Sequence, residues 1–255
     1  MPVTASRSAR RTNRVVGLDL AGSPRRDTGA CAMDGPRRLT AAVLHTDQEI
    51  VGFVRALQPD LVVIDAPLSL PRGRRTIEDR SGPHLRECDR VLLRWRLPFF
   101  PLTLGPMRML TVRGMELADR LRKEGFSVLE GYPGGAQDLL RLPRKKAGAE
   151  RLQRALMRRG LGGDLELRPL THDELDAVTI AWVGWAFRRG KGILIGDPTE
   201  GLMLLPAAIP GFRTPRRRRA AKSVRRPSPA ERTPASRARP RRGQGGSPRR
   251  RRQGG

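Results

Sequence analysis

Cysteine, histidine and aromatic side chains are scarce in this chain of 255 residues. Its two cysteines cannot form the disulfide framework of a small secreted protein, so we expect a reducing, cytoplasmic location. His84 and Cys88 lie four residues apart in a predicted helix, but two ligands alone do not make a zinc site. Large apolar side chains are almost absent from the last stretch of the chain, so the folded part must end near Phe212.

Long apolar runs are missing as well. No segment approaches the ~18 consecutive apolar residues that cross a bilayer. The basic N-terminal segment is not followed by the apolar stretch of a secretory signal. We therefore expect no membrane partner and no secretory signal.

Positive charge is abundant, but it is unevenly distributed. Residues 213–255 hold 17 of the 51 Lys and Arg residues and a single acid, Glu231, so this segment carries most of the net charge of +26. Like charges at this density, without apolar side chains to bury, predict a disordered tail. A second disordered basic arm is predicted over residues 1–13, which leaves residues 14–212 for the folded domain.

Hydrophobic patterning within the predicted domain alternates between strand and helix. Predicted strands cover residues 15–20, 28–33, 39–44, 61–64 and 126–130, and a terminal hairpin pairs 193–195 with 202–205. Predicted helices cover about 46–58, 84–95, 115–125, 135–142, 149–159 and 171–187. Three strands, a helix, a strand, helices, a strand and a long helix predict an α/β fold of the ribonuclease H type. We expect a mixed five-stranded sheet with helices on both faces.

Three carboxylates share one placement in this pattern. Asp19, Asp65 and Glu130 each stand at the C-terminal end of a predicted buried strand. If those strands are parallel neighbours, their ends meet at one edge of the sheet, where sites form in open α/β proteins. Carboxylates brought together repel one another, and a divalent cation is the usual way to relieve that repulsion.

Two more acids lie on the last predicted helix, which starts with a capping box at Thr171. Asp173 and Asp176 are three residues apart, so they share a helix face. That face continues through apolar positions, which predicts that it is turned towards the core. An acid in such a position should be paired, metal-bound or protonated.

Each acid also has a simpler structural explanation. Asp173 can interact with the helix dipole, Glu130 can pair with an arginine, and Asp65 can shape a turn. Asp19, inside an apolar strand, and Asp176, on a core-facing stripe, are harder to explain in this way. The shared placement of the five acids, and no single one of them, predicts a site.

The chemistry predicted for such a site is metal-assisted hydrolysis of phosphodiester bonds. Two Mg²⁺ or Mn²⁺ ions about 4 Å apart would clamp the phosphate. Asp19, at the centre of the sheet, is the expected bridging ligand. Asp65 would hold one ion and Asp173 or Asp176 the other, with Glu130 as a further candidate ligand.

Four segments follow one another in a recognisable order: VVGLDLAGS (15–23), VVIDAPL (62–68), LEGYP (129–133) and HDELDA (172–177). Together they resemble the domain-of-unknown-function 429 family. The resemblance covers roughly residues 14–206 and neither terminal arm. It implies a ribonuclease H fold and, as an expectation, nuclease activity.

The segment GLDLAGS (17–23) is also similar to the opening of RuvC-type Holliday-junction resolvases. That resemblance implies Asp19, Asp65, Asp173 and Asp176 as metal-binding positions. The chain departs from those enzymes in carrying Asp65, and not a glutamate, on its central strand. It also shows no aromatic wedge for opening a junction, so we do not expect junction resolution.

Two other classes of function stay open. A non-catalytic protein would keep the fold, bind nucleic acid and show no metal dependence. Actin-like sugar kinases share this fold and open with a phosphate loop, so Gly17–Ser23 could belong to an ATP-dependent kinase. The second phosphate loop and the adenosine-binding segment of such kinases are not evident.

The basic tail predicts a nucleic-acid partner, DNA or RNA. Arginines contact phosphates without sequence preference and with strong salt dependence. The tail holds no aromatic residue that could stack on bases. A solubilising extension that binds polyanions only incidentally is the alternative. The two arginine runs are Arg216, Arg217, Arg218 and Arg219, and Arg249, Arg250, Arg251 and Arg252.

Overall fold

The computed structural model of the chain describes residues 13–207. The predicted arm, apart from Asn13, and the predicted tail lie outside the described residues. No helix in the described part is long and apolar enough to cross a membrane.

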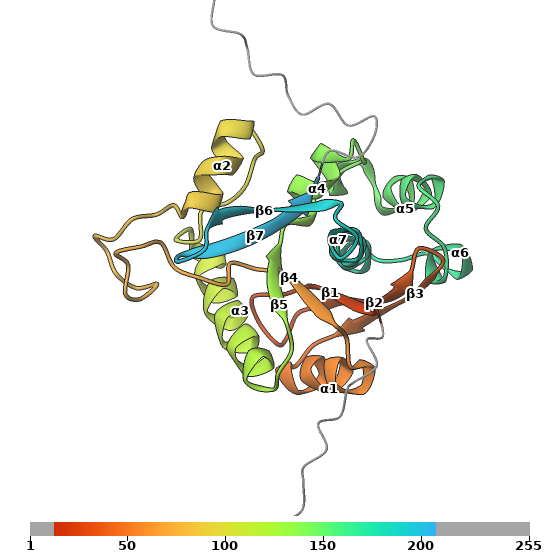
Figure 1. Ribbon diagram of the computed structural model, residues 1–255, viewed down its shortest axis with the longest axis horizontal. Coiled ribbons are helices and arrows are strands. Elements are labelled where there is room, and N and C mark those ends of the chain that lie inside the picture. The colour runs from red at the N-terminus through yellow and green to blue at the C-terminus, as the bar shows by residue number, and fades with distance from the viewer. Residues whose placement is uncertain (1–12, 208–255) are drawn as a thin grey trace, which may run out of the picture. The chain divides into compact units, whose positions relative to one another are not determined.

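A single mixed sheet forms the centre of the described part (Figure 1). Its strands follow the order β3-β2-β1-β4-β5-β7-β6. The four adjacent strands β1, β4, β5 and β7 are parallel to one another, whereas β2 is antiparallel to β1 and β3, and β6 is antiparallel to β7. The strands are β1 (Val15–Asp19), β2 (Thr28–Gly35), β3 (Arg38–Leu44), β4 (Leu61–Asp65), β5 (Val128–Gly131), β6 (Gly192–Asp197) and β7 (Gly201–Pro206).

The predicted fold class is confirmed, because the sheet is mixed, carries helices on both faces and has its first five strands in the ribonuclease H-like order. The prediction of five strands is wrong, since the terminal hairpin extends the sheet to seven. Strand β7 pairs in parallel with β5 through Glu130 with Met203 and Gly131 with Leu204. The hairpin satisfies backbone groups that would otherwise be unpaired at the edge of β5.

The helices occupy most of the predicted positions, but one begins earlier than predicted and another, Asp164–Leu167, was not predicted. Helix α3 starts ten residues earlier than predicted, at Gly105, and Pro106 stands in its first turn, where a missing N–H costs no hydrogen bond. The helices are α1 (Asp47–Leu57), α2 (Glu87–Trp95), α3 (Gly105–Lys123), α4 (Pro133–Leu139), α5 (Ala149–Arg158), α6 (Asp164–Leu167) and α7 (His172–Phe187), with a 3-10 turn η1 (Lys145–Ala147).

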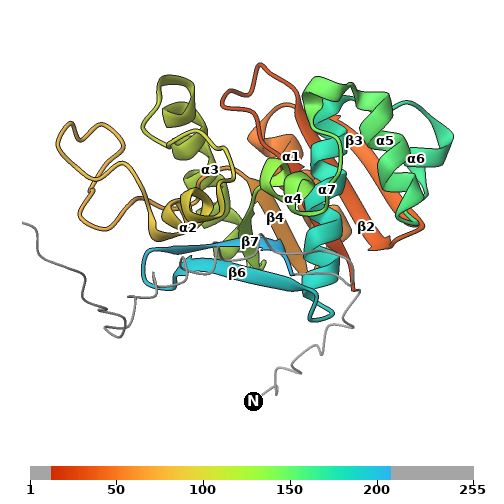
Figure 2. The ribbon, with the colours of Figure 1, turned by 90° about the horizontal axis from the view of Figure 1, so that it is seen from above.

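The two faces of the sheet carry different helices. Figure 1 shows α1 and α3 on one face, and Figure 2 shows α7 lying across the central strands on the other. Side chains of β1 and β4 alternate between the two sides. Val16 and Ile64 are buried with residues of α1 and α3. Val15 and Val63 are buried with residues of α7. Both strands are thus covered on both faces, as continuous apolar runs require.

Helix α7 lies unusually close to the sheet because glycines stand beneath it. A Cβ atom at Gly17 would overlap the carbonyl oxygen of Ala177, and one at Gly29 would overlap the carbonyl oxygen of Asp173. The first turn of α7 is therefore fixed over β2, next to the end of β1.

Replacing Gly29 by alanine tests this contact. Because the new methyl group would collide with helix backbone, we expect Gly29→Ala to lower the free energy of unfolding by about 1–3 kcal/mol. The matched control is Gly52→Ala in α1, where a Cβ atom would meet nothing within 4 Å. Removing that helix glycine should raise stability by about 0.5–1 kcal/mol. Urea unfolding measures both changes, and equal effects would contradict the close packing of α7.

Candidate active site

The first part of the site is a pair of carboxylates at the C-terminal edge of the sheet. Asp19 ends β1 and Asp65 ends β4, and these two residues are direct partners in the parallel register. Neighbouring strands lie about 4.8 Å apart. Residues two apart in a strand share a face, so Asp19 lies on the face of Gly17 and Asp65 on that of Val63. Both of these residues face α7. Asp19 and Asp65 are half-buried. The predicted meeting of two strand-end acids at one edge is therefore confirmed for this pair.

Helix α7 supplies the second part of the site. Its first turn is held by a capping box, in which the Thr171 hydroxyl accepts from the Glu174 N–H and the Glu174 carboxylate accepts from the Thr171 N–H. Asp173 therefore lies in a fixed first turn, above Gly29, which is the register partner of Asp19.

Asp176 lies one turn further along α7, and it is buried as predicted. Its Oδ1 accepts a hydrogen bond of 2.6 Å from Nε2 of Gln137, which is itself buried in α4. Our sequence reasoning missed Gln137. Gly134 and Gly135, just before Gln137, indicate that α4 packs closely against its neighbours. Nothing in the sequence, however, links α4 to Asp176.

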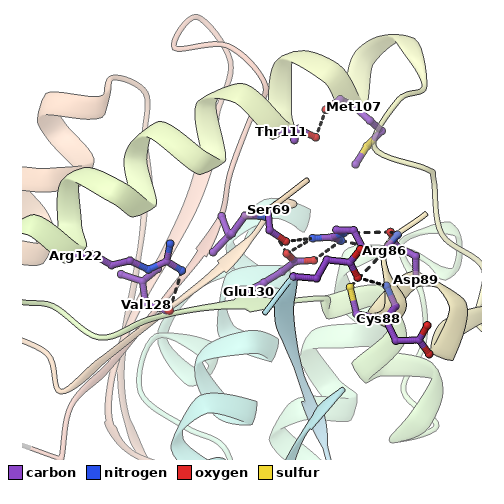
Figure 3. Close-up of polar contacts among 12 residues, drawn as sticks. Ser69, Arg86, Cys88, Asp89, Met107, Thr111, Arg122, Val128 and Glu130 are labelled. Atoms are coloured by element: carbon purple, nitrogen blue, oxygen red, sulfur yellow. Dashed lines mark hydrogen bonds and ion pairs between the residues drawn. The ribbon is translucent and has the colours of Figure 1, made fainter. Parts of the chain in front are cut away.

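Glu130 does not join these acids. In the parallel register it is the partner of Ile64, so its side chain lies on the face opposite to α7. There it is buried and forms a two-pronged ion pair with Arg86, at 2.6 and 2.8 Å (Figure 3). It also accepts the Leu68 N–H at 2.9 Å. The prediction that Glu130 is a metal ligand gives way to the simpler alternative of an arginine pair.

Arg86 is the centre of this buried charge cluster. Its guanidinium contacts Asp89 and Glu130 through two hydrogen bonds each, and its Nη1 reaches the Ser69 hydroxyl at 3.4 Å (Figure 3). All five guanidinium N–H groups therefore have partners. Burial alone would lower the pKa of Arg86, but the carboxylates of Glu130 and Asp89 outweigh it and raise that pKa, so the side chain stays charged.

Cys88 and His84 do not form a metal site. Cys88 is buried, and burial raises the pKa of its thiol. His84 is exposed and its Nδ1 lies 2.9 Å from the Thr103 hydroxyl. Neither arrangement is that of a zinc ligand.

The carboxylate pair suits a hard divalent cation of the magnesium type. Within residues 13–207, no group of three or more His, Cys, Asp or Glu residues is placed to hold a metal ion. Mg²⁺, however, is commonly bound by one or two carboxylates, with waters and substrate phosphates completing its shell. The two oxygen donors of Asp19 and Asp65 fit that mode of binding, whereas a closed protein cage is not formed.

Comparison with known proteins gives one family and a weak structural likeness. The model of a family described as "Protein of unknown function (DUF429)" matches residues 17–200. A structure of Thermus thermophilus RuvC in complex with a Holliday junction substrate has a TM-score of 0.43 and 16% identity, over 69% of this chain and 96% of that chain. Another T. thermophilus RuvC structure has a TM-score of 0.34 and 15% identity over the same shares. No curated protein sequence matches the chain.

Removing the cation of the buried cluster should be far more costly than removing a surface one. Arg86→Met leaves Glu130 and Asp89 buried without their counter-charge, so we expect the free energy of unfolding to fall by about 3–5 kcal/mol. The control is Arg55→Met, which breaks an equally short but exposed pair with Glu124 and should cost less than about 1 kcal/mol. Chemical denaturation of both variants measures the two losses. A decrease in the free energy of unfolding for Arg86→Met as small as that for Arg55→Met would show that the cluster does not stabilise the fold.

Proposed function

This chain belongs to the DUF429 family, and we propose that it is a metal-dependent nuclease that hydrolyses phosphodiester bonds in DNA or RNA. The observation that carries the proposal is the register pairing of Asp19 with Asp65 at the C-terminal edge of the sheet, beneath the first turn of α7. Edges of this kind are where open α/β sheets place their ligands.

The donor set supports the choice of cation and of substrate. Asp19 and Asp65 would hold Mg²⁺ or Mn²⁺ and leave coordination positions for water and for a phosphate oxygen of the substrate. When bound, such an ion supplies a Lewis acid for the phosphoryl oxygen and an acidified water as nucleophile. A phosphodiester would bring an anionic oxygen that completes the shell of such a cation.

The two acids of α7 have distinct roles in this proposal. Asp173, half-buried in the capped first turn, could bind a second cation or orient a water. Asp176 is held by Gln137 and is positioned by that hydrogen bond. The capping box fixes the direction of the helix, so it acts on both acids together.

The kinase alternative is weakened by where its expected phosphate loop lies. Gly17 is an interior residue of β1, and its missing side chain makes room for the backbone of α7. Helix packing therefore explains this glycine without a bound nucleotide. The non-catalytic alternative is separated from the nuclease by the experiment below.

Asparagine at either strand-end carboxylate should abolish turnover. We expect Asp19→Asn and Asp65→Asn each to lower the cleavage rate of labelled DNA or RNA, branched forms included, at least about 100-fold in Mg²⁺ or Mn²⁺, because each removes a charged oxygen ligand. Both variants should also lose the rise in melting temperature that Mn²⁺ gives to the wild type.

The control for this pair is Asp119→Asn, an exposed acid of α3 that pairs with Lys123. It should keep both cleavage and the response to Mn²⁺. Cleavage that persists in Asp19→Asn and Asp65→Asn, or that never appears on any substrate, would sink the nuclease proposal. Binding of nucleic acid without any cleavage would favour the non-catalytic alternative.

We also propose that the basic tail binds the phosphates of the nucleic acid. Log affinity for duplex DNA falls linearly with log salt concentration, with a slope of about −0.9 for each phosphate that the protein neutralises. Deleting residues 213–255 should therefore make this slope shallower. Exchanging lysine for arginine at positions 216–219 and 249–252 keeps the charge and should keep the slope. An unchanged slope after the deletion would show that the tail does not take part.

A further inference from the structure

A cavity opens directly beside the carboxylate pair. It has a volume of about 170 Å³, and Asp65 is part of its wall. The wall runs from the ends of β4 and β5 to α2, α3 and the segment that joins these two helices. The proposed function leaves this space unused.

Apolar and aromatic side chains line much of the cavity. Two of the six phenylalanines, Phe99 and Phe100, and the single tyrosine, Tyr132, line it. Leu110 and Met107 of α3 add apolar side chains to the wall. Phe100 keeps 70% of its surface exposed, between two prolines of the α2–α3 connection, so its ring is available to a ligand. An exposed aromatic ring at the wall of an apolar cavity is a surface on which a flat molecule can stack.

The arginine in the wall of the cavity is not available to bind a phosphate. Arg86 is the cation in its wall, and all its N–H groups already bind Asp89, Glu130 and Ser69. Asp89 and Glu130, which Arg86 binds, also line the wall, as does Asp65. Arg86 therefore has no N–H left to offer to an anionic group, whereas a neutral ring needs no such donor.

The volume sets the size of the ligand. A water takes about 30 Å³ of the liquid, so the cavity has the room of about five or six waters. Sites for drug-sized ligands begin near ~300 Å³. The space therefore suits one planar ring system and is too small for a whole nucleotide.

We propose that this cavity receives one unstacked base of a nucleic-acid strand, with Phe100 as the stacking residue and Tyr132 as part of the wall. The Tyr132 hydroxyl donates to the Pro98 carbonyl oxygen, which ties the end of β5 to the segment that carries Phe100. A base held there places its own backbone next to Asp65. This inference rests on the proposed function, and it adds a preference for single-stranded or locally unpaired substrate, because a paired base cannot enter.

The test reads base stacking without cleavage. The full chain, in excess EDTA, is titrated into a short single strand that carries one 2-aminopurine, whose fluorescence falls when it stacks. We expect strong quenching with the wild type and little with Phe100→Ala or Phe100→Leu, since leucine keeps the bulk but not the ring. The tail cannot imitate this signal, because residues 213–255 contain no aromatic side chain.

A second measurement compares an intact strand with one that has a single abasic position. Removing the stacking of a base on an aromatic side chain weakens binding about 5-fold to 160-fold, so the wild type should prefer the intact strand by that factor. Phe100→Ala should bind both strands equally. The matched control is Leu167→Ala, which removes a 79%-exposed apolar side chain on α6 and should behave as the wild type. All three substitutions are at exposed positions, so unchanged melting temperatures confirm folding.

The outcomes separate this inference from the nuclease proposal. Equal quenching by the wild type and Phe100→Ala overturns the base site. An equal affinity of the wild type for intact and abasic strands overturns it as well. In both cases the nuclease proposal still holds if cleavage is abolished only in the Asp19 and Asp65 variants. Base preference that depends on Phe100, in a protein that cleaves nothing, supports the base site and rejects the nuclease. A wild type that binds no strand in EDTA overturns the base site, and the cleavage assay in Mg²⁺ or Mn²⁺ then tests the nuclease by itself.

Discussion

The close approach of α7 to the sheet is the contact on which the rest of the arrangement depends. Gly17 and Gly29 leave room for the helix backbone, and Gly184 of the helix leaves room for the side chains of Val15 and Val63. Glycine thus occurs on both sides of the same interface. Because the helix backbone lies directly on β1 and β2, its first turn is brought to the end of β1, where Asp19 stands.

The sheet keeps its acids apart by placing them on opposite faces. Asp19 and Asp65 lie on the α7 face, and Glu130 lies on the other, where Arg86 neutralises it. A buried carboxylate with a full set of donors is structural, because its charge is already balanced. Asp19 and Asp65 lie side by side in direct register, and in the function proposed above they would hold the cation. Under that proposal, acids at one sheet edge have two different roles.

With the cavity beside Asp65, the proposed site has two parts, one for a phosphate and its cation and one for a base. Charged oxygens gather at the carboxylate pair, and aromatic rings gather in the neighbouring cavity. A nucleotide has the same division, with an anionic phosphate joined to a flat, neutral base. The buried Arg86 cluster supports this arrangement because it ties α2 to β5, and so it holds the two walls of the cavity at a fixed separation.

The sequence alone determined the element types, the fold class and the two strand-end acids, because these follow from local periodicity and from the position of a residue within its own strand. It also identified α7 as the capped helix with Asp176 on its buried face. Tertiary structure decided which elements are neighbours: it joined the hairpin to β5, linked Gln137 to Asp176, and placed Phe100 and Tyr132 around one cavity. Glu130 shows the reason most clearly. Its position at the end of a strand can be predicted from the residues around it. The face of the sheet on which its side chain lies, and its pairing with Arg86, 44 residues away, depend on strand register and packing, which a local sequence pattern does not predict.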